Sequence, residues 1–134
     1  MNAHFPAAIP EIPVSDISAA LDYYANRLGF TIDWGEEGGG GIAGISRGDC
    51  RMFLTNAAFR EHYGNGGPVL VWLNLHSKEE VDALHELWRG KQVKIISAPE
   101  SKPWGLHEFM ASDLDGNLLR VFYDFATPER ERRA

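Results

Sequence analysis

The sequence predicts an α+β fold made of two tandem modules, each with the order strand, helix, strand, strand, strand. The first reason is that this order of patterns occurs once before and once after a polar, glycine-rich linker at 57–68. The second reason is a hairpin signal at the end of the chain. Asp115-Gly116 separates two strand-like runs at 107–112 and 118–123, and glycine tolerates the positive φ of a tight turn.

Length, charge and composition limit the class of protein. The 134 residues, of which 44% are hydrophobic and 24% charged, suit one globular domain. The net charge of −6 argues against a nucleic-acid partner and is compatible with a cationic ligand. The single cysteine, Cys50, excludes a disulfide framework and is expected to be an inert thiol in a reducing compartment. Without a signal-peptide pattern or a membrane-spanning apolar run, the chain is expected in the cytoplasm.

The first module is expected at about 8–56. It begins with an edge strand at 9–14, because its two prolines cannot complete a ladder of hydrogen bonds. A helix capped by Ser15 or Asp16 and ending before Gly29 follows. Three further strands are predicted at 30–34, 42–46 and 51–55.

The second module is expected at about 69–124 and begins with a strand at 69–75. Ser77 and Glu80 form a capping-box pattern at the start of its helix. Trp88 lies on the apolar stripe of this helix, which predicts a core or interface position. The chain is completed by three strands at 93–97, 107–112 and 118–123, a loop at 98–105 and a flexible charged tail at 125–134.

Several short motifs stand on this framework. They are Asp16 at a helix start, Tyr23-Tyr24, Arg27-Leu28-Gly29-Phe30, Val71-Trp72-Leu73, Pro103-Trp104-Gly105 followed by Glu108-Phe109, and Asp113-x-Asp115-Gly116-Asn117. With the repeated element order, they resemble the vicinal oxygen chelate superfamily over about 8–124, and within it the bleomycin resistance proteins. The resemblance implies a curved, cup-shaped sheet and a homodimer. It also implies ligand crevices near the subunit boundary and an N-terminal arm that reaches the partner.

Enzymes of this superfamily hold a divalent metal with His, Glu or Gln side chains on inner strand positions. The resemblance places those positions here on Ile9, Phe53, Leu70 and Arg120. Apolar side chains offer no lone pair, and an arginine repels a cation. The five histidines are scattered without a metal-binding spacing. We therefore expect no metal, no cofactor and no catalytic residue.

The period of two along a strand extends this set of inner positions. The further residues predicted to face the cup are Glu11, Arg51, Thr55, Trp72, Asn74, Leu118 and Phe122. Aromatic walls with a few polar groups are typical of a small-molecule site.

The resemblance indicates which residues bind the ligand. It puts Trp34, Trp72 and Trp104 at ring-binding positions, and Glu36 and Glu37 where resistance proteins carry acidic residues. The predicted ligand-binding set is completed by Phe53, His107 and Arg120. The chain departs from the resistance pattern in two ways: the 36–41 turn is richer in glycine, and a histidine replaces a commonly basic residue before Glu-Phe.

Three functions remain open from the sequence. The first is a dimeric protein that sequesters a bleomycin-type, cationic aromatic antibiotic without catalysis, which suits the aromatic cup and the acidic balance. The second is a metal-dependent lyase, isomerase or dioxygenase, which requires metal ligands that the sequence does not supply at the expected positions. The third is a binding protein for another small molecule, because one fold hosts many functions.

Overall fold

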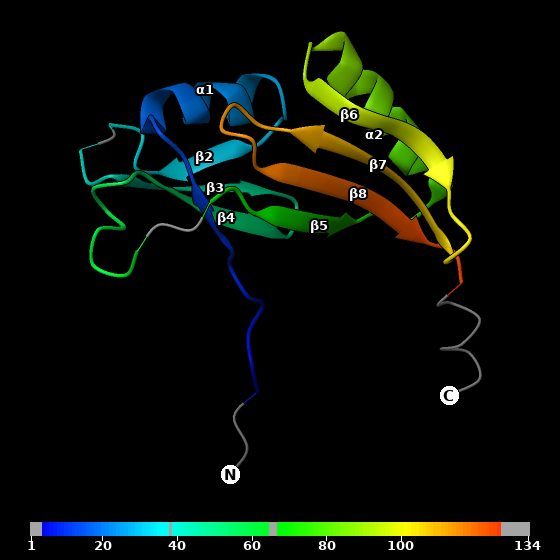
Figure 1. The fold of residues 1–134 in the computed structure, drawn as a ribbon, viewed down its shortest axis with the longest axis horizontal. Coiled ribbons are helices and arrows are strands. Elements are labelled where there is room, and N and C mark those ends of the chain that lie inside the picture. Colours follow the sequence, from blue (N-terminus) through cyan, green and yellow to red (C-terminus); the bar gives the residue numbers. More distant parts are fainter. Residues whose placement is uncertain (1–3, 38, 65–66, 127–134) are drawn as a thin grey trace.

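The computed structural model describes residues 4–37, 39–64 and 67–126, and within them the chain forms two modules of identical element order (Figure 1). The first module contains β1 (Glu11–Pro13), α1 (Ile17–Asn26), β2 (Thr31–Trp34), β3 (Ile42–Arg47) and β4 (Cys50–Thr55). The second contains β5 (Leu70–Asn74), α2 (Lys78–Gly90), β6 (Lys94–Ser101), β7 (Leu106–Ser112) and β8 (Leu118–Asp124). The predicted repeat of strand, helix and three strands is therefore confirmed.

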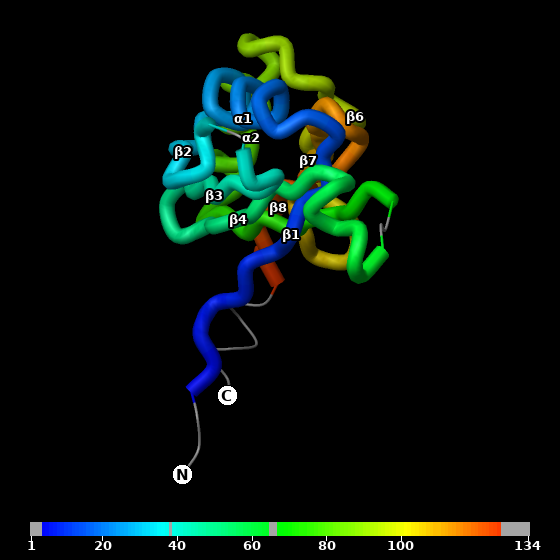
Figure 2. Tube along the Cα trace, turned by 90° about the vertical axis from the view of Figure 1, so that its left-hand side faces the viewer, coloured from blue at the N-terminus to red at the C-terminus, as the bar shows by residue number. Residues whose placement is uncertain are grey.

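Each module builds one four-stranded sheet, and the two sheets share a topology. The strand order is β1-β4-β3-β2 in the first sheet and β5-β8-β7-β6 in the second, so the first strand of each module pairs with the last. That pairing is parallel, whereas the other pairings are antiparallel. Figure 1 shows the sheets side by side along the long axis of the molecule. In Figure 2, α1 lies at the top and the N-terminal arm leaves at the bottom, with β3 and β4 between them.

Side-chain caps begin both helices at the predicted residues. Asp16 Oδ1 accepts a hydrogen bond from the Ala19 N–H at 3.2 Å, at the start of α1. Ser77 Oγ accepts from the Glu80 N–H at 3.1 Å, and Glu80 Oε1 accepts in return from the His76 N–H at 2.8 Å. These contacts satisfy donors that the first turn of a helix leaves unpaired.

One face of each sheet packs against the helices, and the residues between the packed ones point the other way. The buried strand residues include Ile12, Ala43, Ile45, Met52 and Leu54 in the first sheet and Phe109, Ala111, Leu119 and Val121 in the second. Trp88 of α2 belongs to the same apolar core and is only 1% exposed, which confirms its predicted core position. We call the opposite side of each sheet the exposed face. It carries Trp34, Phe53, Leu70, Trp72, Arg120 and Phe122.

The loop predicted at 98–105 is wrong in its first half, because β6 continues to Ser101. Glu100 and Ser101 pair with residues of β7, and this pairing outweighs the local turn signal of Pro99. Two register shifts interrupt the β6–β7 ladder, and β6 is an edge strand, where proline is tolerated. The loop that carries Pro-Trp-Gly is therefore confined to 102–105.

The turn at 113–117 joins β7 to β8, which confirms the predicted hairpin. Gly116 has φ +84°, a conformation that glycine adopts without steric cost. The buried Asp113 carboxylate accepts hydrogen bonds from the N–H groups of Asp115 and Asn117 at 2.8 and 2.9 Å, and from Asn117 Nδ2 at 2.9 Å. One side chain thus organises the whole turn.

The same turn connects the two modules. Asp113 also accepts a hydrogen bond from the Tyr24 hydroxyl of α1 at 2.8 Å, and Asn117 Nδ2 donates to a β1 carbonyl at 2.8 Å. Asp115 accepts from the N–H and the hydroxyl of Ser15, just before α1, at 3.0 and 2.8 Å. We call Asp113, Asp115 and Asn117 the module latch.

Because the buried Tyr24 hydroxyl donates to Asp113 of the latch, we expect the folded protein to lose stability in alkaline solution. Burial, together with the neighbouring Asp113 carboxylate, raises the pKa of Tyr24 above its ordinary value. The unfolded chain releases this proton above about pH 10, whereas the folded chain keeps it, so the unfolded state binds fewer protons. The free energy of unfolding should then fall by about 1.4 kcal/mol per pH unit above about pH 10. Urea unfolding at a series of alkaline pH values measures this slope.

The Tyr24→Phe variant tests whether that slope belongs to the latch. Phenylalanine has no proton to release, so we expect this variant to lose most of the alkaline slope although it is less stable at neutral pH. Tyr123→Phe is the control, because Tyr123 lies on β8 and takes no part in the hydrogen bond between Tyr24 and Asp113. An unchanged slope in Tyr24→Phe would contradict the assignment.

Of the predicted tail, only Phe125 and Ala126 belong to the described residues, and the Phe125 N–H donates to the Gly105 carbonyl at 3.0 Å. Neither α1 nor α2 has the length and apolar character that crossing a membrane requires, and the described residues contain no other helix that does.

Candidate functional site

The exposed face of the first sheet carries an aromatic pair. Trp34 of β2 and Phe53 of β4 meet edge to face, with ring centroids 5.1 Å apart. They meet because Gly44 of β3 lies between them in the register and has no side chain. A Cβ atom at Gly44 would overlap the indole of Trp34, so glycine is required here by close approach. We call Trp34 and Phe53 the first-sheet pair.

The exposed face of the second sheet carries a larger cluster, and β5 and β8 supply its centre. Trp72 and Phe122 meet edge to face with centroids 5.5 Å apart. The guanidinium carbon of Arg120 lies 4.9 Å from the centroid of the Trp72 ring, within the range of a cation–π interaction. This pairing follows from the register, in which Trp72 lies opposite Arg120.

A buried carboxylate completes this cluster. Glu108 of β7 is only 3% exposed, and its Oε1 lies 3.1 Å from Arg120 Nε. Its Oε2 accepts a hydrogen bond at 3.2 Å from Nε1 of Trp104, which stands on the 102–105 loop. A buried charge is costly unless it is paired and hydrogen-bonded, so both contacts hold their side chains in place. Trp72, Phe122, Arg120, Glu108 and Trp104 form what we call the second-sheet cluster.

Glu108 was not among the residues that the sequence predicted to bind a ligand. Its position could have been predicted from the hairpin. Counting back from the turn places Glu108 opposite Phe122, so both side chains point to the exposed face. Its side chain contacts Trp104 and Arg120 on the exposed face, although it is itself almost fully buried.

A cleft of about 730 Å³ lies between the two modules. Arg51 borders it from β4, Trp72 and Asn74 border it from β5, and Pro10 borders it from the N-terminal arm. Cys50 lines it as well, and burial raises the pKa of its thiol, which supports the interpretation of an inert side chain. The structure thus brings polar and aromatic side chains from both sheets to one hollow.

Another polar contact stands at the β1 edge of the exposed face. The Glu11 carboxylate accepts hydrogen bonds from the Thr55 hydroxyl at 3.0 Å and from the Tyr63 hydroxyl at 2.5 Å. The hydrogen bond to Glu11 raises the pKa of Tyr63. This contact ties the 57–68 linker to the first sheet.

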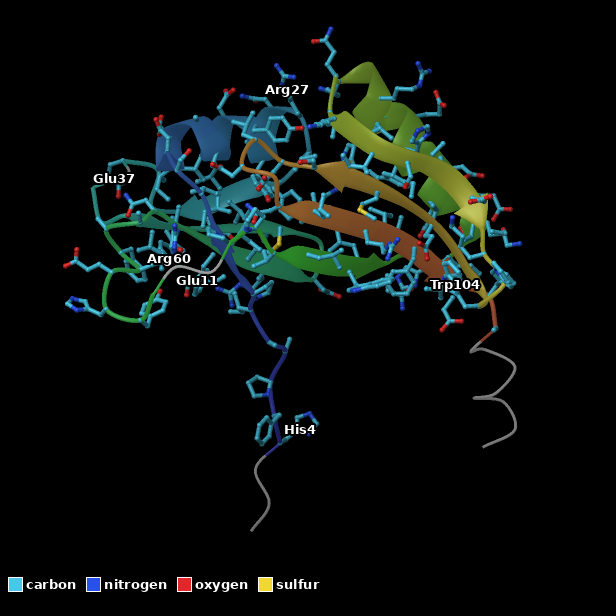
Figure 3. All side chains as sticks on the ribbon, in the orientation of Figure 1. His4, Glu11, Arg27, Glu37, Arg60 and Trp104 are labelled. Carbon is cyan, nitrogen blue, oxygen red and sulfur yellow. The ribbon has the colours of Figure 1, made fainter. Side chains whose placement is uncertain are left out.

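Three predicted ligand-binding residues are not brought to these clusters within one chain. Glu36 borders a hollow beside α1, on the helix side of the first sheet, and Glu37 is exposed in the following turn. Figure 3 shows Glu37 and Trp104 near opposite ends of the molecule. His107 points to the helix side of β7, where its Nε2 lies 2.8 Å from Asp82 Oδ1 of α2.

The position of His107 departs from the predicted site for a simple reason. Its neighbour Glu108 faces the cluster, and adjacent residues of a strand point to opposite faces. The Nδ1 atom of His107 lies 2.9 Å from the hydroxyl of Ser101 in β6, so both ring nitrogens have partners on the helix side. We therefore do not include His107 in the candidate site.

The side chains at the positions that the resemblance assigned to metal ligands do not fit a metal. Phe53 and Leu70 are apolar, Arg120 is cationic, and the nearby Glu108 is paired with Arg120. No group of three His, Cys, Asp or Glu side chains suited to a metal ion occurs in residues 4–37, 39–64 and 67–126.

Comparison with known proteins identifies the family. The profile of the Glyoxalase/Bleomycin resistance protein/Dioxygenase superfamily matches residues 6–121. The chain belongs to this superfamily. It is similar to bleomycin resistance proteins of Geobacillus stearothermophilus and Staphylococcus aureus, with 26% identity over 127 residues and coverage of 86% of this chain and 94% of each relative.

Solved structures of the superfamily agree on the fold. The bleomycin-binding protein of Streptomyces verticillus, in complex with copper(II)-bleomycin, has a TM-score of 0.68 and 25% identity, covering 90% of this chain and 97% of that one. The lactoylglutathione lyase of Agrobacterium tumefaciens has a TM-score of 0.71 and 19% identity, covering 88% and 94%. The superfamily thus holds enzymes as well as binding proteins, and membership alone does not assign catalysis.

Proposed function

We propose that the protein binds bleomycin-type antibiotics and sequesters them without catalysis. The observation that carries this proposal is the second-sheet cluster, which presents open aromatic rings on a sheet face. Trp72 is 48% exposed and Trp104 is 61% exposed. Large aromatic side chains that stay this open on a sheet favour a ligand or partner that covers them. The bleomycin resistance relatives support the choice of ligand class.

The absence of catalysis is part of the same proposal. Sequestration requires only a complementary surface, and planar rings stack on open tryptophan faces without any reacting group. The positions that the resemblance assigns to the metal ligands of the superfamily's enzymes carry Phe53, Leu70 and Arg120 here, and the chemistry of these side chains favours binding over metal-assisted turnover.

We further propose that the binding unit is a homodimer. The first-sheet pair and the second-sheet cluster lie on different sheets of one chain. In such a dimer, a two-fold axis would place the first sheet of each copy opposite the second sheet of the other copy. Each of the two identical crevices would then be lined by the first-sheet pair of one copy and the second-sheet cluster of the other. Sedimentation equilibrium should then give twice the chain mass of 14.9 kDa, and a single-chain mass with ligand bound would contradict this arrangement.

Replacing Trp72 with alanine should weaken bleomycin binding by about 1–3 kcal/mol, because an aromatic anchor in a desolvated site dominates binding energy. Trp72→Phe keeps a ring and should recover part of the loss. Titration of the purified protein with metal-free and copper-loaded bleomycin, followed by intrinsic tryptophan fluorescence and calorimetry, measures both affinities.

Phe59→Ala is the matched control, because Phe59 is a partly exposed ring on the 57–68 linker and belongs to neither aromatic set. We expect it to bind as the parent does. If the parent shows no saturable signal at micromolar bleomycin, the antibiotic assignment fails and another small molecule must be sought. If Trp72→Ala binds unchanged while folded, the second-sheet cluster is not the site.

A further inference from the structure

Arg120 has an unusual environment for an arginine on a sheet face. Its side chain is 28% exposed and lies against the Trp72 ring, with the guanidinium carbon 4.9 Å from the ring centroid. Its Nε is buried and close to Glu108 Oε1, but the N–H makes no hydrogen bond to that carboxylate. Among the side-chain atoms of the described residues, this Nε is the one that is buried without a hydrogen-bond partner.

The two terminal nitrogens of the Arg120 guanidinium also lack hydrogen-bond acceptors among the described residues. Within residues 4–37, 39–64 and 67–126, no acceptor forms a hydrogen bond with Nη1 or Nη2 of Arg120. The Nη1 and Nη2 donors of the partly exposed side chain are therefore available to a ligand, whereas Nε faces the Glu108 carboxylate. A guanidinium presents its donors in a planar fork that matches the two oxygens of a carboxylate.

A second arginine borders the same region. Arg51 lines the cleft that Trp72 also lines, and its guanidinium carbon lies 6.0 Å from the centroid of the Phe53 ring. Arg47 lines this cleft too, but its Nη1 donates to a backbone carbonyl at 2.7 Å. Asp49 is the carboxylate among the lining residues, beside these arginines in the β3–β4 turn. The cleft is therefore more cationic than the net charge of −6 suggests.

We propose that this site takes a planar aromatic group bearing a carboxylate, with Arg120 as the anchor for the carboxylate and Trp72 as the stacking platform for the ring. This inference rests on the proposed function, in which the exposed face binds a ligand. It adds aromatic carboxylates to the ligands that this face would take. Glu108 is a positioning residue, because its carboxylate holds the Arg120 guanidinium on one side and the Trp104 indole on the other. Arg51 supplies a further positive charge at the cleft.

The test compares three ligands that share the naphthalene ring system and differ in the charge of their substituent. They are 2-naphthoate, the neutral 2-naphthylmethanol and the cationic 2-naphthylmethylamine, each titrated into the full chain by calorimetry and tryptophan fluorescence. We expect 2-naphthoate to bind at least about tenfold more tightly than the neutral alcohol, because charge-assisted bidentate contacts are about twice as strong as neutral hydrogen bonds. Added salt should reduce this preference. Equal affinities for the acid and the alcohol, or tighter binding of the amine, would overturn the proposal.

Variants then assign the preference to Arg120. Arg120→Gln should abolish it, and Arg120→Lys should retain only part of it, because an ammonium lacks the planar fork. Removing Arg120 alone leaves Glu108 buried without its cation, so the double variant Glu108→Gln/Arg120→Gln keeps the test informative if the single variant unfolds. Arg89→Gln is the control, since Arg89 pairs with Glu86 on the exposed side of α2. A folded variant without Arg120 that still prefers 2-naphthoate would overturn the proposal.

Bleomycin titrated into the same proteins separates this inference from the proposed function. Binding of bleomycin without any preference for 2-naphthoate would overturn the carboxylate anchor and leave antibiotic sequestration standing. A preference for 2-naphthoate that Arg120→Gln abolishes, without binding of bleomycin, would support the anchor and overturn the antibiotic assignment.

Discussion

Replacing Asp113 with alanine is expected to lower the free energy of unfolding by about 3–5 kcal/mol. The buried carboxylate accepts hydrogen bonds from the Tyr24 hydroxyl, from two backbone N–H groups of the turn and from Asn117 Nδ2. Alanine would leave these donors unpaired in a region from which water is excluded, at a cost of about 1–3 kcal/mol for each buried group left unsatisfied. Because the latch joins the modules, the loss should affect both sheets. Chemical denaturation followed by circular dichroism and tryptophan fluorescence measures it.

Leu114→Ala is the matched control for Asp113→Ala. Leu114 stands in the same turn but its side chain is exposed, so its removal should change the stability by no more than about 0.5 kcal/mol. Asp113→Asn provides a second comparison, because asparagine keeps one acceptor oxygen and should lose less than alanine does. If Asp113→Ala unfolds at the same denaturant concentration as the parent, the latch does not hold the modules together.

Replacing Trp88 with alanine is expected to destabilise the protein by about 3–5 kcal/mol. The indole packs edge to face against Phe109 of β7 with centroids 5.8 Å apart. Its Nε1 donates a hydrogen bond at 3.2 Å to the carbonyl of Leu28, just after α1. Alanine would open a cavity between α2 and the second sheet and would remove a contact between the modules. Thermal and urea unfolding measure the effect.

Leu87→Ala serves as the neighbouring control on α2, because Leu87 is exposed and alanine is a good helix former. We expect a change within about 0.5 kcal/mol for this variant. Trp88→Phe should fall between the two, since it keeps a ring and loses the hydrogen bond to Leu28. Equal stabilities for Trp88→Ala and Leu87→Ala would contradict the position of Trp88 in the core.

The order of elements was predictable because its signals are local. Asp16 and Ser77 cap helices through hydrogen bonds to residues three positions away, and such contacts can be read directly from the chain. Strand alternation likewise identified which side of each strand faces the helices. The prediction failed at 98–101, where pairing with β7 extends β6 through Pro99. That pairing joins segments whose register no local pattern specifies.

The candidate site was predictable in part. Phe53, Trp72 and Arg120 lie on the exposed face, as the family resemblance and the period of two along a strand together implied. Trp34, which the resemblance alone had placed, lies there as well. The role of Glu108 was missed, because its partners come from different elements: Trp104 from the loop before β7 and Arg120 from β8. Their association depends on the β7–β8 register together with the path of the 102–105 loop.

By itself, the sequence determined two βαβββ modules, their helix caps and the hairpin at the end of the chain. These features follow from backbone preferences, capping and hydrophobic periodicity, which act over a few residues. Only the tertiary structure decided that the hairpin turn is also the latch between the modules. The reason is that Asp113 meets Tyr24 across 89 residues of chain, and Asp115 meets Ser15 across 100. It likewise decided that Arg120 rests on Trp72 beside the buried Glu108, with a donor left without an acceptor, because packing across three strands sets that contact.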